Sequence, residues 1–543
     1  MGIRGGGVEG RTRREFLRLA AGASVCAFAW PVLAACGGTP ASSERVEMGA
    51  VPVLRDPSPP KQKRSGLLRM AATPDTLGGV LLPLISGQLC CVDPRSGEVY
   101  GDLAQKVELA GELQVAFTLR ADARFHPNAD GLASALTADA VERDFRARAA
   151  AREFLFTEVI DRVESPDERT VVLHLRAPFG TLFESLADPA QAAIRDVGRY
   201  ASINLPLGAG PFVPAEVSAD AVLLASNPLY HRPGLPLLEA INVLIRPDSA
   251  AIEGLAGSGA LDVHRLAGGQ PPASVGMRQA RRPSRGMFGI ALSVATLQRS
   301  DRAGAPGPFA EERVRRAVAL SIDRDELLSA AKAIESGPVG PAFASDALKP
   351  EELRAHSIYR RQPQAAVGLL AAANKAELAF SMLAPDTVEA RSMLTSIQKQ
   401  VAEAGMRMRP TLVPAAEWEK SLRGGEFEAV LFDSPNLKTP DAGLRLHTSA
   451  GLEGTFSPWG FSNPVFDAAA RRALSALSPI ERGNRSRQAQ RVLLDSVPAL
   501  LPLGTRVEGA WVGTSVQGYE WDADTFNEGW FAATWRLDSA RRG

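Results

Sequence analysis

Cysteine is scarce in this chain of 543 residues, which has only four copies. Two of them, Cys26 and Cys36, lie in the first 36 residues, and the other two, Cys90 and Cys91, are adjacent. Adjacent cysteines seldom form a disulfide because the bond strains the backbone between them, and the count excludes a disulfide framework. We therefore expect Cys90 and Cys91 to be buried as small apolar side chains.

Motifs for metal or enzyme chemistry are also missing from the sequence. The six histidines are scattered, with no helical pairing and no nearby cysteine, so zinc-site spacing is absent. A phosphate-binding loop, a nucleophile elbow and a paired-carboxylate motif are absent as well. The glycines of 254–259 lack dinucleotide-loop spacing, and we interpret them as turn residues. The sequence predicts no enzyme activity, no cofactor and no metal.

An excess of charge of one sign is absent too. Lysine plus arginine and aspartate plus glutamate number 61 each, so the formal net charge is zero. A protein that binds nucleic acid usually has a basic excess or stripe. We therefore do not expect a nucleic-acid partner.

The N-terminus has the features of an export signal. A basic patch with Arg13 and Arg14 precedes an apolar run, Ala20–Ala35, of about 16 residues, shorter than the roughly 20 that a membrane-spanning helix needs. This layout is typical of a twin-arginine signal. The run ends in Leu-Ala-Ala-Cys-Gly, which resembles a bacterial lipobox with Cys36 as the lipidated residue and mature N-terminus. The alternative is that Cys36 is an ordinary apolar residue of the signal core.

Lipidation would hold the protein on a membrane outside the cytoplasm, because more than one acyl chain gives stable attachment. Residues 37–66 are rich in Gly, Pro, Ser and charge and lack an apolar period, which predicts a flexible linker. Such a linker would let the body move roughly 30 Å from the bilayer. Its basic run, 61–64, is interpreted as a solvated stretch, with a contact to lipid headgroups as the alternative.

The rest of the chain, from Leu67 onward, is long enough for two or three domains. It alternates short apolar strands with amphipathic helices, the pattern of an α/β protein with mixed sheets. Residues 113–120 alternate apolar and polar side chains and predict a strand with one buried face. Residues 170–175 predict a second strand after a turn at 165–168.

Helices are predicted from caps and apolar stripes. Thr137 can cap the helix that follows it. Residues 311–322 place their apolar side chains on one face, and Asp323 begins the next helix. Residues 391–404 carry another stripe that ends at Gly405.

Six segments follow one another in the order of a known family's motifs. They are 117–141, 163–172, 207–212, 227–230, 314–324 and 461–467. Residues 117–126, for example, are similar to F-x-L-R-x-x-x-x-F-H, and 314–324 to V-R-x-A-I-x-x-A-I-D-R. From about Leu67 to about Arg506 the chain resembles the extracellular solute-binding proteins (family 5) that serve dipeptide, oligopeptide and nickel ABC importers.

The resemblance implies a two-lobed periplasmic-binding-protein-like α/β fold with mixed sheets, a hinge and a satellite domain. By this analogy the chain divides into a signal (1–36), a linker (37–66), lobe I (67–91, 205–285 and 506–543), a satellite domain (92–204) and lobe II (286–505). The lobes would close on a ligand, and the transporter would read the closure. The expected partners of this monomer are a peptide or other small solute, an ABC permease and, through the lipid, a membrane.

Relatives that bind peptides hold the ligand's amino group with an acidic residue in a loop like W-x-x-D-x-x-D-P. The corresponding loop here, 432–441, lacks the tryptophan. Asn436 or Lys438 falls near the expected carboxylate, with Asp433 and Asp441 at the margins. Asp433, Asn436 and Asp441 are therefore candidate ligand contacts, with helix capping as the alternative for Asp441. Recognition of a free amino terminus is left open.

Three further candidates follow from the resemblance. Trp459 and Phe461 lie in a segment similar to an aromatic loop that faces the cleft in relatives, with core packing as the alternative. Arg391, or the backbone amides of 386–389, could meet a ligand carboxylate at a helix N-terminus. The alternative for Arg391 is a surface charge.

Two other functions compete with solute capture for transport. The same fold could serve a lipoprotein that senses a ligand or acts as a scaffold. A cofactor enzyme exported by the twin-arginine route is the second competitor, since that route carries folded proteins.

Overall fold

The computed structural model describes residues 66–93, 96–111, 113–200, 205–266, 276–295, 306–449, 456–519 and 528–538, and positions 54, 64 and 203. The predicted signal, with Arg13, Arg14 and Cys36, lies outside the described residues, as does nearly all of the linker. Arg64, at the end of the basic run, donates hydrogen bonds to the Pro236 carbonyl at 2.9 Å and to Ser226 Oγ at 3.0 Å.

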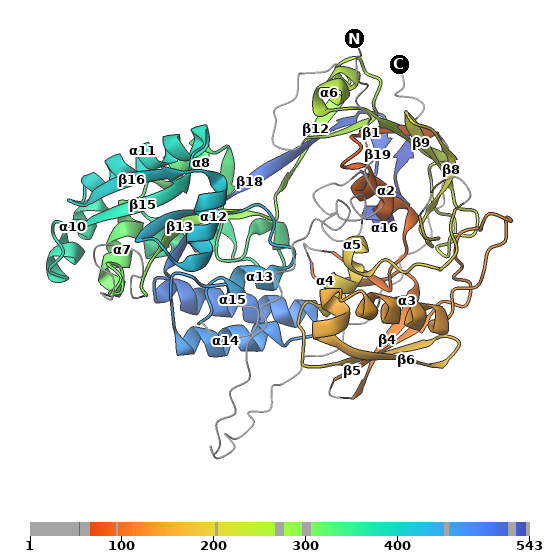
Figure 1. Ribbon diagram of the computed structural model, residues 1–543, viewed down its shortest axis with the longest axis horizontal. Coiled ribbons are helices and arrows are strands. Elements are labelled where there is room, and N and C mark those ends of the chain that lie inside the picture. The colour runs from red at the N-terminus through yellow and green to blue at the C-terminus, as the bar shows by residue number, and fades with distance from the viewer. Residues whose placement is uncertain are drawn as a thin grey trace, which may run out of the picture.

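Lobe I is built on a four-stranded sheet of order β1-β10-β9-β8, in which β1 is parallel to β10. Its strands are β1 (Leu67–Ala72), β8 (Phe212–Val217), β9 (Ala221–Ser226) and β10 (Ala240–Ile245). Around them lie α2 (Leu77–Ile85), α6 (Ser249–Gly257), α16 (Glu528–Ala532), β19 (Val516–Gln517) and β20 (Arg536–Leu537). The first and last described segments of the chain therefore belong to one lobe (Figure 1).

The satellite body is built on a second four-stranded sheet, antiparallel and of order β4-β5-β7-β6. Its strands are β4 (Ala104–Gly111), β5 (Gln114–Leu119), β6 (Ile160–Asp167) and β7 (Thr170–Leu175). The pair β2 (Cys90–Val92) and β3 (Val99–Gly101) and the helices α3 (Ala138–Ala150), α4 (Leu182–Ala187) and α5 (Pro189–Ala192) complete it. Figure 1 shows this body beneath lobe I.

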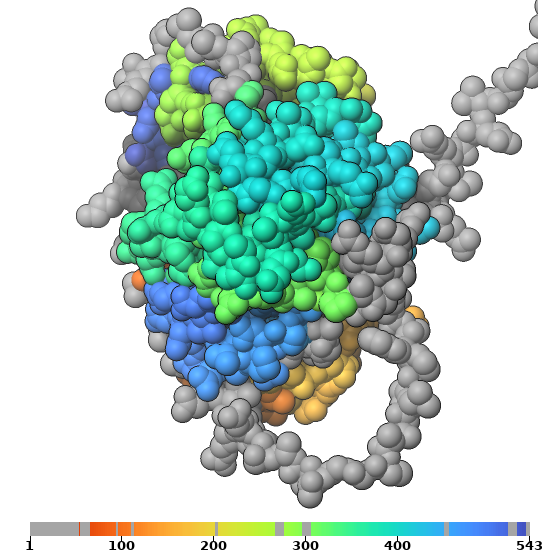
Figure 2. All heavy atoms as spheres, turned by 90° about the vertical axis from the view of Figure 1, so that its left-hand side faces the viewer, coloured from red at the N-terminus to blue at the C-terminus, as the bar shows by residue number. Residues whose placement is uncertain are grey.

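Lobe II has a mixed sheet whose central strands are β13 (Met287–Leu292), β17 (Ala429–Ser434), β15 (Ala379–Pro385) and β16 (Arg407–Val413). Its helices are α7 (Glu312–Ser321), α8 (Arg324–Ala330), α9 (Pro350–Ala355), α10 (Pro363–Ala372), α11 (Val388–Ala402), α12 (Ala415–Gly424), α13 (Pro440–Arg445), α14 (Pro464–Leu474) and α15 (Pro479–Asp495). In Figure 2, which faces this lobe, α14 and α15 (blue) lie at its lower edge beside the satellite body (orange).

Alternate side chains of β17 enter two different cores, because successive residues of a strand point to opposite faces. Ala429 and Leu431 join the core beneath α7, α8, α10 and α11. Val430 and Phe432 join a core that also contains α14, α15 and the apolar interior of the satellite body. The satellite body and lobe II therefore share one apolar core.

A two-stranded antiparallel ribbon crosses between the lobes. One strand is β18 (Leu500–Gly513), and the other consists of β12 (Met277–Pro283) and β13, joined at residues 284–286. The lobe II end of β18 also pairs with β14 (Ala333–Glu335), and its lobe I end with β11 (Val263–Leu266). We call residues 284–286 and 504–506, where the ribbon passes from one lobe to the other, the hinge.

Hydroxyl groups stabilise the hinge. Thr505 Oγ1 lies 3.0 Å from Ser284 Oγ and donates to the Gly286 carbonyl at 2.5 Å. The Ser284 amide donates to the Arg506 carbonyl at 2.8 Å. Gly286 permits a close approach, because a Cβ on it would lie 2.6 Å from the Pro435 carbonyl oxygen.

The predicted caps and strands are largely confirmed. Thr137 accepts a hydrogen bond from the Ala140 amide, Asp323 accepts one from the Glu326 amide, and β7 spans the predicted 170–175. The segments predicted at 113–120 and 311–322 are one residue shorter at each end, as β5 and α7. Cys90 and Cys91 form no disulfide and are 0% exposed, as expected.

Two predictions about helices were wrong in their bounds. The helix predicted at 391–404 is α11, which begins three residues earlier because Thr387 accepts a hydrogen bond from the Ala390 amide. Gly254 and Gly257, expected in a turn, lie in α6, which Asp248 caps. Only the end of that glycine cluster turns, at Gly259 with φ +73°.

Candidate functional site

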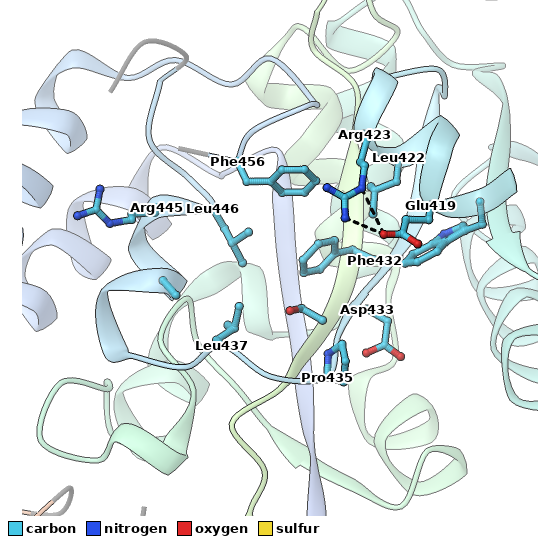
Figure 3. Close-up of a pocket in the computed structure, with 13 residues that line it drawn as sticks. Glu419, Leu422, Arg423, Phe432, Asp433, Pro435, Leu437, Arg445, Leu446 and Phe456 are labelled. Atoms are coloured by element: carbon cyan, nitrogen blue, oxygen red, sulfur yellow. Dashed lines mark hydrogen bonds and ion pairs between the residues drawn. The ribbon is translucent and has the colours of Figure 1, made fainter. Parts of the chain in front are cut away.

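A cavity of about 580 Å³ lies in lobe II next to the hinge. Three elements enclose it: α12, the end of β17 with the loop after it, and α13 (Figure 3). The lining residues are Trp418, Glu419, Leu422, Arg423, Phe432, Asp433, Ser434, Pro435, Leu437, Ala442, Arg445, Leu446 and Phe456. The volume is in the range of pockets that hold small molecules.

The interior of the cavity is mainly apolar and aromatic. The rings of Phe432 and Phe456 point toward the same space (Figure 3). Behind them lies Trp459, with 0% exposure and ring centroids 5.7 Å and 6.1 Å from those of Phe432 and Phe456. Rigid rings give a large contact area at a low cost in conformational entropy, so this wall is suited to an apolar group.

Each charged side chain of the lining has a partner of opposite charge. Glu419 Oε1 accepts from Arg423 Nη2 at 2.7 Å, both on α12. Arg445 Nε donates to Asp441 Oδ2 at 2.8 Å, both on α13. Asp433 is held from the hinge, where Arg506 Nη1 lies 3.0 Å from its Oδ1.

Arg506 connects the cavity to the crossing ribbon. It lies on β18, and Nη2 also pairs with Glu389 Oε1 at 2.8 Å, while the guanidinium carbon lies 5.4 Å from the centre of the Phe288 ring. Burial lowers the pKa of Arg506, but hydrogen bonds and charges from Asp433 and Glu389 outweigh this and raise its pKa above the ordinary value. Arg506 is therefore a fixed positive charge between the cavity and the hinge.

The predicted binding residues are distributed unevenly around this cavity. Asp433 lines it. Asn436 is exposed in the loop after β17 and does not line it. Asp441 is 8% exposed and contacts the lining residue Arg445. The helix of Asp441 begins at Pro440 and not at Ala442, because proline is favoured in the first turn.

The other three candidates lie farther from the cavity. Trp459 and Phe461 are 0% and 4% exposed in the apolar core, and the Trp459 indole Nε1 has no hydrogen-bond partner. Arg391 is an exposed side chain at the start of α11, forms an ion pair with Asp386 and does not line the cavity. The sequence interpretation missed the lining residues Arg445 and Phe456 and the hinge residue Arg506.

Within the described ranges, no cluster of three or more His, Cys, Asp or Glu side chains is placed to hold a metal ion. Over the same residues, no helix combines the length and the apolar character needed to cross a bilayer.

Two lobes joined by a crossing ribbon, with a cavity beside the hinge, are the architecture of a two-lobed ligand-binding protein. The family model described as "Bacterial extracellular solute-binding proteins, family 5 Middle" matches residues 98–451, more than half of the chain. The chain belongs to this family. The predicted fold class is confirmed, whereas the predicted domain boundaries stay predictions.

Individual relatives are distant in sequence but match over most of their length. The chain is 24% identical over 486 residues to the "Probable di/tripeptide-binding protein 5" of Pseudomonas aeruginosa (strain UCBPP-PA14), covering 80% of this chain and 87% of the relative. HbpA2 from Haemophilus parasuis matches with a TM-score of 0.74 at 17% identity, over 88% of this chain and 100% of its own. DppA from Helicobacter pylori in complex with the peptide STSA matches with a TM-score of 0.58 at 17% identity, over 88% of this chain and 98% of its own.

Proposed function

We propose that this protein captures a peptide or peptide-like small solute outside the cytoplasm and delivers it to an ABC importer. The observation that carries the proposal is the cavity beside the hinge, whose lining residue Asp433 is joined by an ion pair to Arg506 on the crossing strand. A ligand in this cavity can act on the position of the lobes because a cavity residue and a hinge residue are in direct contact. Family membership and the names of the relatives support a solute of this class.

Native mass spectrometry of gently purified protein tests solute capture. The wild type should carry a bound small molecule, and adding that molecule to ligand-free protein should raise the melting temperature, because a ligand that binds only the folded state stabilises it by mass action. Ala442→Trp, which fills the cavity, should lose the bound mass. Ala371→Trp, at an exposed position of α10, should keep it.

Two results would contradict solute capture. One is a wild type that carries no small molecule and shows no thermal shift with extracts of the medium. The other is equal retention of the bound mass by both tryptophan variants. Uptake of the identified solute by cells with and without this chain separates transport from a sensing or scaffold role. Cells that lack the chain should lose uptake only if the protein serves transport.

We propose in addition that a lipid on Cys36 anchors the protein to the membrane, after export directed by Arg13 and Arg14. Cys36→Ala should move the protein from the detergent phase to the aqueous phase in a detergent partition experiment. Cys26→Ala, in the same apolar segment, should leave it in the detergent phase. Equal partitioning of the two variants would show that Cys36 carries no anchor.

A further inference from the structure

The cavity combines an apolar wall with charged side chains that are already paired within the chain. The two carboxylate oxygens of Asp433 are both engaged by one guanidinium, with Arg506 Nη1 3.0 Å from Oδ1 and Nη2 2.9 Å from Oδ2. Two parallel contacts of this kind are the strongest arrangement of an arginine and a carboxylate. A ligand ammonium that approaches Asp433 would therefore have to compete with Arg506 for its oxygens.

Arg506 is itself held from two other sides. Glu389 Oε1 lies 2.8 Å from Nη2, and the guanidinium carbon lies 5.4 Å from the centre of the Phe288 ring. The neighbouring residue Thr505 is fixed by hydrogen bonds to Ser284 and Gly286 across the ribbon. Displacing Arg506 would therefore disturb several contacts of the hinge at once.

The other lining charges are arranged differently. Arg445 extends away from the centre of the cavity (Figure 3) and pairs with Asp441. Glu419 and Arg423 pair with each other on α12, where their side chains are 56% and 54% exposed. Water can solvate the charges of Glu419 and Arg423, and the buried Asp441 neutralises the charge of Arg445.

A ligand group that enters the cavity meets mainly carbon atoms. Phe432, Leu437, Leu446 and Leu422 are buried, and the other apolar lining residues are Trp418, Pro435, Ala442 and Phe456. Moving an ammonium or a carboxylate into such surroundings is costly unless a partner of opposite charge is free to receive it. Arg506 already holds both oxygens of Asp433 and also pairs with Glu389, so a charged ligand group would have to compete with these contacts.

We propose that this cavity receives an uncharged, mainly apolar group of the ligand, such as a hydrophobic side chain or a blocked chain end, and that Arg506 determines this preference by occupying Asp433. This inference rests on the proposed capture of a peptide-like solute. It assigns to Arg506 a role in specificity, separate from its place in the hinge.

The test compares two peptide libraries that differ in one charge. One library contains tripeptides with free amino groups, and the other contains the same tripeptides with acetylated amino groups. Both are offered together to ligand-free protein at equal concentration, and native mass spectrometry gives the ratio of bound acetylated to bound free peptide. The wild type should bind the acetylated form at least as well as the free form.

Arg506→Gln should shift this ratio toward the free form by about tenfold, because it releases the Asp433 carboxylate for a ligand ammonium. The double variant Arg506→Gln with Asp433→Asn should return to the wild-type ratio. Arg407→Gln is the matched control, because it releases Glu377, an exposed carboxylate that does not line the cavity. Its ratio should change less than twofold.

Three outcomes would overturn the inference. They are a wild type that prefers free amino groups tenfold, a ratio that Arg506→Gln does not move, and a wild type that binds neither library. The last outcome leaves solute capture to be judged by the molecule that co-purifies with the protein. Circular dichroism and melting temperature of each variant confirm that it is folded, which is expected because partly exposed ion pairs contribute little to stability.

Discussion

Lobe II meets the rest of the protein at two junctions that are built differently. The hinge joins lobe II to lobe I through backbone pairing, the hydroxyls of Ser284 and Thr505, and the partly exposed Arg506. The second junction, which we call the distal junction, brings Arg482 of α15 against Glu184 of α4 and Asp346 of lobe II. Arg482 Nη2 lies 2.6 Å from Glu184 Oε1, and Nε lies 2.8 Å from Asp346 Oδ1.

Burial distinguishes the distal junction most clearly. The side chains of Arg482, Glu184 and Asp346 are 2%, 0% and 2% exposed, whereas that of Arg506 is 38% exposed. Burial lowers the pKa of Arg482, but the two carboxylates outweigh it and raise the pKa well above the ordinary value. Burial raises the pKa of Glu184, and Arg482 lowers it only in part. The chain therefore fixes one junction with buried charge and leaves the other to weaker contacts.

Close backbone contact accompanies the buried charges. The Gly180 amide donates to the Leu474 carbonyl at 2.6 Å, and Arg482 Nη1 donates to the Gly180 carbonyl at 2.7 Å. A Cβ at Gly180 would lie 2.7 Å from the Leu474 carbonyl oxygen, so a larger residue would push the two bodies apart. We infer from this difference that movement of lobe II is resisted more at its contact with the satellite body than at the hinge.

Arg482→Met should have the largest effect on stability. It leaves Glu184 and Asp346 buried without a cation, and removing one partner of a buried ion pair costs about 3 to 5 kcal/mol. Urea denaturation followed by circular dichroism measures the loss. Arg485→Met, on the same helix, breaks a more exposed pair with Glu481 and should cost less than about 1 kcal/mol. Similar losses in both variants would refute the contrast between the junctions.

Acid should weaken the helices of the distal junction before the hinge. His447, between α13 and α14, is 0% exposed, and burial lowers its pKa to about 3. Because the pKa of this histidine is lower in the folded than in the unfolded state, its contribution to stability is fully present above pH 6.5, the ordinary pKa. This contribution is lost as the pH falls toward 3. Between pH 7 and pH 5 the free energy of unfolding should fall by about 2 kcal/mol from this group.

Hydrogen exchange at the two pH values, corrected for the intrinsic rate, measures this effect. Exchange in α14 and α15 should increase relative to exchange in β12 and β18. His447→Leu removes the titrating group and should abolish that difference, because neither ring nitrogen of His447 has a hydrogen-bond partner to lose. Equal acceleration of the helices and the ribbon would contradict the prediction.

Thr505→Val should have the smallest effect of the three. It keeps the shape of the side chain but removes the hydroxyl that donates to Gly286 and lies beside Ser284 Oγ, which should cost about 1 kcal/mol. Thr395→Val removes an exposed hydroxyl that bonds within α11 and should cost less than about 0.5 kcal/mol. A loss at Thr505 as large as that of Arg482→Met would reverse the order of the two junctions.

Local signals in the sequence predict much of the secondary structure. Caps such as Thr137 and Asp323 act within four residues, so a short segment contains all the information needed. The start of α11 was misjudged because Val388 is 86% exposed and adds nothing to the apolar stripe. Thr387, which caps the helix, is the local signal that marks its start.

The site was harder to predict because its main contact is remote in sequence. Asp433 was found from its place in a loop, but its partner Arg506 is 73 residues away and on another strand. Arg445 and Phe456 line the cavity beside Phe432 although neither belongs to β17. The order of motifs is sufficient to predict the family. The ion pair between Asp433 and Arg506 could not be predicted in this way because it depends on how the strands pack.

The reactivity of the two buried thiols reports on local opening of the satellite body. Cys90 and Cys91 are both 0% exposed, and burial raises the pKa of Cys90 well above its ordinary value. A thiol in this state reacts with an alkylating reagent only while the surrounding strands are separated, because the thiolate is the reactive form. The rate of alkylation in the native protein therefore measures how often these strands separate, and no cysteine or probe has to be introduced.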